Sequence, residues 1–196
     1  MSATTTSAGL PGGIPVAATP DAAPGIGHRL GAPDAPHRLV VWGTYECLHC
    51  RRAWPTVRAL VEEGAGRLAV EWRHFAPPGA FPHAGAVAAV AEAAAGQGAF
   101  WPMHEALLAA PAPLPPGLLP AIGVALGLDA GRLAADAGGD AVRARLAAQG
   151  ADAVARGVTG TPTVALDGAV LPRTWDLEAL AAAVRAAVGG SAGARG

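Results

Sequence analysis

The sequence predicts an α/β protein built on a four-stranded mixed sheet, with a block of helices inserted into it. Two short strand patterns flank a helical pattern near residues 39–75, the stretch 83–157 contains no convincing strand, and a hairpin pattern precedes a final helix after residue 160. A helical crossover makes the first two strands parallel, and the hairpin adds antiparallel partners. We expect one domain over residues 36–188.

The first 35 residues are rich in Ala, Gly, Pro and Thr and have no hydrophobic periodicity. Such a composition predicts a flexible leader over residues 1–35. The stretch lacks a basic n-region, and Pro11 and Pro15 interrupt its apolar pieces, so it does not resemble a signal peptide. We therefore expect a cytoplasmic protein, in a compartment that keeps thiols reduced.

The first strand is predicted at residues 39–42, a β-branched apolar run that ends before Gly43. The helical pattern "RRAWPTVRALVEEG" follows, with apolar residues on one face and Gly64 at its end. The segment "RLAVEWRHF" alternates apolar and polar residues and predicts the second strand.

The middle of the chain predicts helices only. The segments "HAGAVAAVAEAAAGQG", "AFWPMHEALLAA" and "DAVRARLAAQGADAVARG" are helical by composition or by the spacing of their apolar residues. We expect a helical insert over about residues 81–157.

The C-terminal part predicts a hairpin and a helix. Asp167 and Gly168 separate two apolar runs in "TPTVALDGAVLP", which is a strong hairpin signal. The amphipathic segment "DLEALAAAVRAAV" follows, with Asp176 placed to cap it. Residues 189–196 are expected to be disordered.

Composition excludes two classes of protein. Hydrophobic residues make up 52% of the chain, but alanine dominates them and no apolar stretch is long enough for a bilayer, so we expect no membrane span. The net charge is −1 and no basic run occurs, although all 14 basic residues are arginine. Nucleic acid is therefore not an expected partner, because phosphate binding needs clustered cations.

The segment "TYECLHCRRAWP" contains both cysteines of the chain, Cys47 and Cys50. Two intervening residues let both sulfurs lie on the first turn of a helix, where free N–H groups and the helix dipole favour a thiolate. Cys47 directly follows the strand and is predicted to be the attacking nucleophile. Cys50, one turn further, is predicted to be the more buried resolving thiol.

His49 is predicted to tune the dithiol. A partly cationic imidazole beside the thiolate lowers its pKa and makes the disulfide more oxidising. Arg51 and Arg52 add positive potential nearby.

A second candidate site lies at Thr161 and Pro162, just before a predicted strand. Proline is tolerated at the first residue of a strand, and the preceding bond can be cis. Such a bond would turn the Thr161 backbone toward the dithiol, where it could pair with an extended peptide.

The ordered motifs "GAPDAPHRLVVWGTYECLHC", "RHF", "FPHA", "FWPMHEALL", "LGLD" and "GVTGTPTVALDG" resemble the DsbA-like branch of the thioredoxin superfamily, in the bacterial subgroup with an inserted helical subdomain. Similar domains occur appended to some sodium/proton antiporters. The resemblance covers roughly residues 31–188. It implies a thioredoxin-like fold, thiol–disulfide exchange with protein or small thiol substrates, a redox recycling partner, a cis-Pro162 loop and no prosthetic group.

The chain departs from this family at Leu48, where relatives usually carry proline. The dipeptide between the cysteines sets the reduction potential, so the direction of electron flow stays open. The lack of a signal peptide favours reduction or redox maintenance, whereas His49 favours oxidation.

Other readings of these residues stay open. The same fold supports glutathione-dependent isomerases or transferases, and a CxxC pair can serve a non-catalytic redox-sensing module. Zinc is disfavoured, because only two cysteines exist and the histidines show no ligand-pair spacing. Glu46 is more typical of a hydrogen-bonded acid than of a proton relay, and Trp54 could contact substrate or belong to the core.

Overall fold

The computed structural model describes residues 25–114, 117–172 and 176–190. Five strands form one mixed sheet in the order β1-β3-β2-β4-β5. Their bounds are β1 (His28–Gly31), β2 (His37–Gly43), β3 (Leu68–His74), β4 (Thr163–Leu166) and β5 (Ala169–Val170).

Strand pairing confirms a mixed sheet. Strands β2 and β3 are parallel, with Val41 opposite Trp72, and β4 pairs antiparallel with β2 on the other side. The α/β fold with an inserted helical region is thus as predicted, but the sheet has five strands, not four.

The additional strand, β1, lies inside the segment predicted as a flexible leader. It pairs antiparallel with β3, placing Leu30 opposite Val70. Four residues with no clear alternation carry too weak a local signal to predict a strand. The strand is formed because β3 offers an edge, and residues 1–24 of the predicted leader lie outside the described part of the chain.

Seven helices are described. They are α1 (Leu48–Glu63), α2 (Ala84–Ala95), α3 (Phe100–Ala109), α4 (Leu118–Ala125), α5 (Ala130–Ala137), α6 (Asp140–Ala155) and α7 (Leu177–Gly190). Within the described residues of the predicted insert, 81–114 and 117–157, the structure has helices and loops but no strand.

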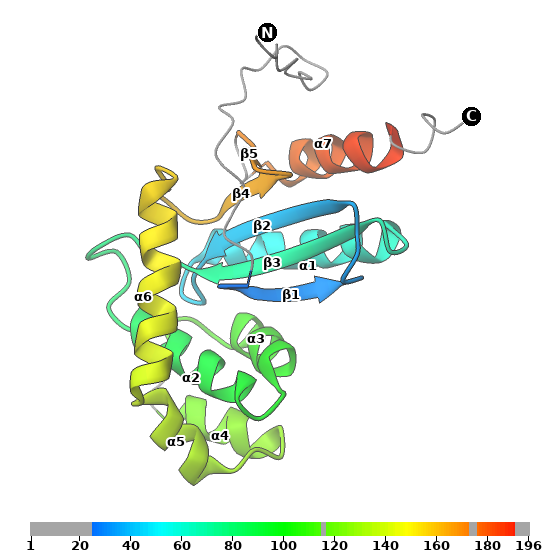
Figure 1. Cartoon of the computed structure of the whole chain (residues 1–196). Helices are drawn as coiled ribbons and strands as arrows, with labels where there is room; N and C mark the ends of the chain where they lie inside the picture. Colours follow the sequence, from blue (N-terminus) through cyan, green and yellow to red (C-terminus); the bar gives the residue numbers. More distant parts are fainter. Residues whose placement is uncertain (1–24, 115–116, 173–175, 191–196) are drawn as a thin grey trace, which may run out of the picture.

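The sheet is covered on both faces. Leu39 and Val41 of β2 belong to the large core formed with α1 and α7, whereas Val40 and Trp42 pack with residues of α6. Figure 1 shows α1 behind the sheet, α6 along one end, and α2 to α5 gathered below it. The alternation of β2 side chains therefore divides the interior into two layers.

The predicted hairpin and final helix are confirmed. Asp167 and Gly168 both have positive φ, 48° and 85°, as a two-residue hairpin turn requires. Asp176 Oδ1 accepts a hydrogen bond of 3.1 Å from the Ala179 N–H and so caps α7. Helix α7 extends to Gly190, so it includes the first two residues of the predicted tail, and 191–196 lie outside the described residues.

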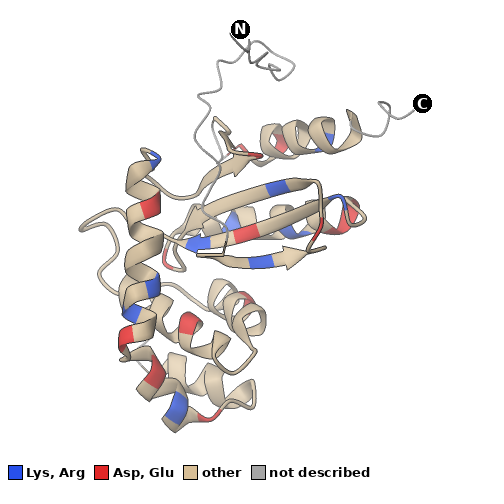
Figure 2. Ribbon diagram, in the orientation of Figure 1, with Lys and Arg blue, Asp and Glu red and all other residues tan. Residues whose placement is uncertain are grey.

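Figure 2 shows charged residues of both signs interspersed along the described ribbon, with both signs on α1 and on α6. Two charged side chains of β3, Glu71 and Arg73, are nevertheless buried beside α6. In the described part of the chain, no helix combines the length and the apolar character needed to cross a bilayer.

Candidate active site

The two cysteines lie where β2 passes into α1. Cys47 is the N-cap residue of α1 and keeps an extended backbone, while Cys50 lies on the first turn. Both thiols are free and both residues are buried, with exposed fractions of 4% and 1%. The sulfur of Cys47 therefore lies beside the free N–H groups of a helix N-terminus, where negative charge is favoured.

The pKa of the Cys47 thiol is lowered from 9.0 to about 5. The largest cause is a hydrogen bond from the Cys50 thiol, and the side chain of Thr161 also contributes, while burial acts in the opposite direction. The backbone N–H groups of Cys50 and His49 favour the thiolate too, although the sulfur forms no geometrically complete capping hydrogen bond. Cys47 is therefore a thiolate at neutral pH.

The environment of Cys50 shifts the pKa of its thiol in the opposite direction. Burial raises the pKa of its thiol first, and both the hydrogen bond to Cys47 and the negative charge there raise it further. Cys50 therefore remains protonated while Cys47 is ionised. Cys47 can therefore act as the nucleophile, while Cys50 remains a protonated thiol that can attack in a later step.

The two residues between the cysteines are both exposed. Leu48 is 54% exposed, and the His49 side chain also faces solvent. The contribution of His49 to the lowered pKa of Cys47 comes through its backbone N–H. That the charge of the His49 imidazole lowers the pKa of Cys47 stays a prediction.

Arg51, which we expected only to add positive potential, is held against the protein. Its Nε donates to the Tyr45 carbonyl at 2.7 Å, and Nη1 donates to the carbonyls of Leu108 and Ala110. The guanidinium thus ties the segment before Cys47 to the end of α3. Burial lowers the pKa of Arg51, while the charges of Glu46 and Cys47 act to raise it, so the cation lies within electrostatic range of the thiolate.

The Thr161–Pro162 segment lies against the dithiol. The Thr161–Pro162 peptide bond is cis, and the Cys47 sulfur lies 3.3 Å from the Thr161 carbonyl oxygen, to which it donates a hydrogen bond only when protonated. These residues are 114 positions apart, and only the pairing of β4 with β2 brings them together.

An aromatic cluster lies beneath the dithiol. The buried rings of Trp54 and Trp72 meet His104 edge-to-face at 4.3 and 4.5 Å, and the Tyr45 hydroxyl bonds to His104 Nδ1 at 3.1 Å. Trp54 is 5% exposed and stacks on Trp101, so it belongs to the core and is not presented to substrate. The cluster fixes α1 against α3.

Glu46 does not point into the dithiol. Its Oε2 accepts a hydrogen bond of 3.1 Å from the backbone N–H of His83, the N-cap residue of α2. This agrees with the interpretation of Glu46 as a hydrogen-bonded acid. Among the described residues, no group of three or more His, Cys, Asp or Glu side chains is placed to hold a metal ion.

Sequence reasoning missed the role of Arg51 and the Tyr45–His104 bond. The four-residue spacing between Cys47 and Arg51 places both on one side of α1 and could have drawn attention to the arginine. No sequence signal reveals that Leu108 and Ala110 supply its acceptors.

Comparison with known proteins links this geometry to one family. A family model described as thioredoxin matches residues 25–186. A thioredoxin-like oxidoreductase from Silicibacter pomeroyi superposes with a TM-score of 0.73 at 28% identity, covering 83% of this chain and 92% of that one. BdbD from Bacillus subtilis gives 0.73 at 18% identity, covering 84% and 94%, and DsbA2 from Pseudomonas aeruginosa gives 0.67 at 22%, covering 80% and 91%.

Sequence relatives include longer proteins. The chain is 38% identical over 167 residues to the Na(+)/H(+) antiporter NhaA 1 of Salinispora arenicola, covering 84% of this chain and 25% of that protein. It is 31% identical over 176 residues to the antiporter NhaA of Herminiimonas arsenicoxydans, covering 88% of this chain and 27% of that protein. The chain thus spans about a quarter of the length of these relatives.

Proposed function

This chain belongs to the thioredoxin family, whose model matches residues 25–186, and we propose that it is a DsbA-like member that exchanges disulfides through its Cys-Leu-His-Cys dithiol. The substrates are thiols or disulfides of proteins or of small molecules. The observation that carries the proposal is the pair of unlike cysteines: a Cys47 thiol with a pKa of about 5, in contact with the Thr161 carbonyl, beside a buried Cys50 whose pKa is raised.

In the reducing direction, the Cys47 thiolate attacks one sulfur of a substrate disulfide, and the other substrate sulfur leaves as a thiolate. Cys50 then loses its proton and attacks the Cys47 sulfur, which closes the Cys47–Cys50 disulfide. The second substrate sulfur leaves as a thiolate. Two electrons have passed to the substrate, and the Cys50 proton goes to solvent or to a leaving thiolate.

In the oxidising direction the same bonds form and break in reverse. A substrate thiolate attacks Cys47 of the disulfide and Cys50 leaves as a thiolate, which takes up a proton. A second substrate thiolate then displaces Cys47. The lowered pKa of Cys47 makes it a good leaving group and stabilises the reduced dithiol, so it supports oxidation of substrates as the favoured direction.

Thr161 and Pro162 form the substrate-binding edge in this proposal. The Thr161 backbone lies against Cys47, two residues before β4 begins, so an extended substrate segment can pair with it in the manner of an added strand. A separate redox partner must return the dithiol to its starting state. We keep the cytoplasmic location as a prediction, to be checked by fractionating cells that produce the tagged full-length protein.

The test uses two variants and one reporter. Cys47→Ala should remove disulfide exchange with a disulfide-containing protein, whereas Cys50→Ala should accumulate a mixed disulfide that appears on non-reducing gels. If both variants exchange disulfides like the wild type, the proposal is wrong. A titration of the dithiol against glutathione mixtures gives the reduction potential, and a value far above the cytosolic poise supports the oxidising direction.

The same variants separate the alternatives. A glutathione-dependent isomerase or transferase would keep its activity without Cys50. A redox-sensing module would exchange disulfides slowly and would change its binding to a partner on oxidation. Elemental analysis of the purified protein tests for zinc.

A second candidate function follows from the antiporter relatives. Because a similar segment makes up about a quarter of NhaA proteins, a redox module that acts on an ion transporter is a specific form of the redox-sensing alternative. Comparing sodium/proton exchange in vesicles that contain such an antiporter, with the oxidised or the reduced protein added, tests it. Equal transport rates in both arms would contradict this candidate.

A further inference from the structure

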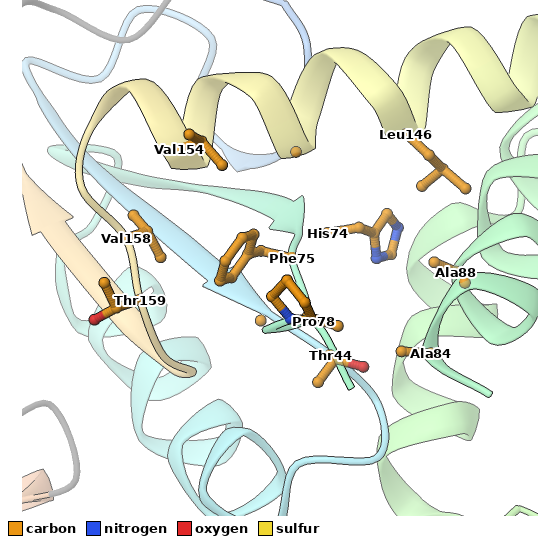
Figure 3. Close-up of a pocket in the computed structure, with 14 residues that line it drawn as sticks. Thr44, His74, Phe75, Pro78, Ala84, Ala88, Leu146, Val154, Val158 and Thr159 are labelled. Carbon is orange, nitrogen blue, oxygen red and sulfur yellow. The ribbon is translucent and has the colours of Figure 1, made fainter. Parts of the chain in front are cut away.

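Two grooves are lined by residues close in sequence to the cysteines. One, of about 520 Å³, lies between α6 and α2, and Figure 3 shows Thr44 and His74 in its wall. Among the described residues that line it, none is Asp, Glu, Lys or Arg. The other, of about 450 Å³, lies between α1 and α3, and its charged lining residues are Arg51, Arg58, Glu62 and Glu105. Of the two grooves, the one between α1 and α3 can therefore act on the dithiol through charge.

The two arginines of this groove have different kinds of partner. Arg58 pairs with the carboxylates of Glu62 at 3.1 Å and of Glu105 at 3.0 Å. The Nη2 of Arg51 is buried and has no hydrogen-bond partner among the described residues. The other N–H groups of its guanidinium donate to three backbone carbonyls, those of Tyr45, Leu108 and Ala110. Carboxylates thus balance the charge of Arg58, whereas the hydrogen-bond acceptors of Arg51 are all neutral.

Two of these acceptors lie at the C-terminal end of α3. The last carbonyls of a helix lack partners within the helix and carry partial negative charge, so a cation is favourable there. Helix α3 has no basic residue in its own last turn, and Arg51 supplies the cation from α1. The same guanidinium donates to the Tyr45 carbonyl at 2.7 Å, two residues before Cys47. Arg51 therefore joins the end of α3 to the loop that presents the nucleophile.

The charge that faces Arg51 changes with the redox state of the dithiol. Arg51 lies one turn after Cys47, and its backbone N–H donates to the Cys47 carbonyl at 3.1 Å. Burial lowers the pKa of Arg51, whereas the negative charges of Glu46 and Cys47 raise it. The Glu46 carboxylate takes no part in exchange, but the charge on Cys47 disappears when the disulfide forms. Because a buried cation is costly without a compensating anion, reduced and oxidised protein hold Arg51 with different strength.

We propose that Arg51 is a positioning residue that favours the reduced dithiol, because its guanidinium is held on the end of α3 more firmly when Cys47 is a thiolate than when it is in a disulfide. This inference rests on the proposed function and adds a residue that sets the direction of exchange. A contact that is stronger in the reduced protein stabilises the reduced protein, and by linkage reduction strengthens the contact by the same factor. Removing the cation therefore makes the protein a weaker oxidant.

The first measurement is the equilibrium constant for reduction of the protein disulfide by two glutathione molecules, which gives the dithiol and glutathione disulfide. Arg51→Gln removes the charge and should lower this constant about tenfold, since a nearby opposite charge lowers a pKa by roughly one unit or more. For a two-electron couple, that factor is about 30 mV. The matched control Arg52→Gln makes the same charge change at the next residue, which is exposed, and should lower the constant less than about twofold.

The second measurement is the pH dependence of Cys47 alkylation, which needs no disulfide exchange. Arg51→Gln should raise the midpoint by about one pH unit. The shift should be smaller than that from Cys50→Ala, because the hydrogen bond from Cys50 is the largest cause of the lowered pKa. Arg51→Lys keeps the charge without the fork of donors, and it should restore most of the wild-type midpoint and equilibrium constant.

The third measurement tests the link to α3 in the wild type itself. The Ala110 N–H donates to the Ala106 carbonyl at 3.0 Å and so reports on the last turn of α3. Its hydrogen exchange, followed by NMR, should be up to about tenfold slower in the reduced than in the oxidised protein. In Arg51→Gln the two states should exchange alike. A purely structural role of Arg51 would change exchange equally in both states.

The remaining outcomes contradict the inference in distinguishable ways. Equal effects of Arg51→Gln and Arg52→Gln would show a general effect of charge and overturn the positioning role. A loss in Arg51→Lys as large as that in Arg51→Gln would overturn the role of the cation. Equal Ala110 exchange in both redox states of the wild type overturns the coupling, even if Arg51→Gln does not fold. If the wild type does not equilibrate with glutathione, the proposed function itself fails, and the alkylation midpoints still decide whether Arg51 acts on Cys47.

Discussion

On the face covered by α1 and α7, the sheet packs apolar side chains such as Leu39 and Val41, whereas the face covered by α6 also buries Glu71 and Arg73. Arg73 donates to Glu71 at 2.6 Å and to Asp152 of α6 at 2.5 Å. One face is thus stabilised by buried apolar surface, whereas the other depends on specific ion pairs between residues far apart in the sequence.

This difference matters for the proposed function because each face positions one half of the candidate site. Helix α1 is fixed on the apolar face and carries both cysteines. Helix α6 is fixed by the buried ion pairs and leads directly into the segment with Thr161 and Pro162. The dithiol therefore depends on apolar packing, and the proposed substrate-binding edge depends on ion pairs between residues far apart in the sequence.

The largest effect is expected from breaking the ion pairs on the α6 face. Arg73→Met should lower the free energy of unfolding by about 3 kcal/mol, because it removes the buried cation that Glu71 and Asp152 share. Asp152 keeps its ion pair with Arg156 at 2.8 Å, and Glu71 keeps Arg38 at 3.9 Å, so the loss stays at the low end for a broken buried pair. Urea denaturation measures the change. The double variant E71M/R73M should recover part of the loss, since it removes a carboxylate together with the cation, and no recovery would contradict this explanation.

The second effect concerns the pH dependence of Cys47 on the α1 face. The alkylation rate of the reduced protein at Cys47 should have its midpoint near pH 5 instead of near 9, as the lowered pKa requires. Because the folded pKa lies below the unfolded one, ionisation stabilises the folded reduced protein. That stability is fully present above about pH 9 and is lost as the pH falls through 5. Urea denaturation of the reduced protein and of Cys47→Ala across this range measures the difference.

Two variants sharpen this pH test. Cys50→Ala should raise the alkylation midpoint most, since the Cys50 hydrogen bond is the largest cause of the lowered pKa. His49→Ala should raise it less, because the exposed imidazole is screened by water and the backbone N–H remains. A larger shift from His49→Ala than from Cys50→Ala would show that the imidazole dominates.

The smallest effect is expected at the solvent surface of α1. Arg58 and Glu62 form an ion pair at 3.1 Å with side chains 50% and 67% exposed. Glu62→Gln should change the free energy of unfolding by only about 0.2–0.5 kcal/mol, and less in high salt. A loss comparable to that of Arg73→Met would contradict the proposed contrast between buried and exposed pairs.

The sequence predicted the elements whose signals are local. The run 39–42, the Asp167-Gly168 turn and the Asp176 cap each follow from a few neighbouring residues, and all are present. Strand β1 was missed because it exists only through its pairing with β3. Of the candidate site, the two cysteines and the cis bond before Pro162 were predicted, but the acceptors of Arg51 were not.

The sequence by itself determined that a dithiol lies at the junction of a strand and a helix, because backbone periodicity and the CxxC spacing act within a few residues. Only the tertiary structure decided that Cys47 meets Thr161 across 114 positions and that Arg73 meets Asp152. Contacts between distant segments depend on how whole layers pack, and no local pattern records which side chains will then face one another.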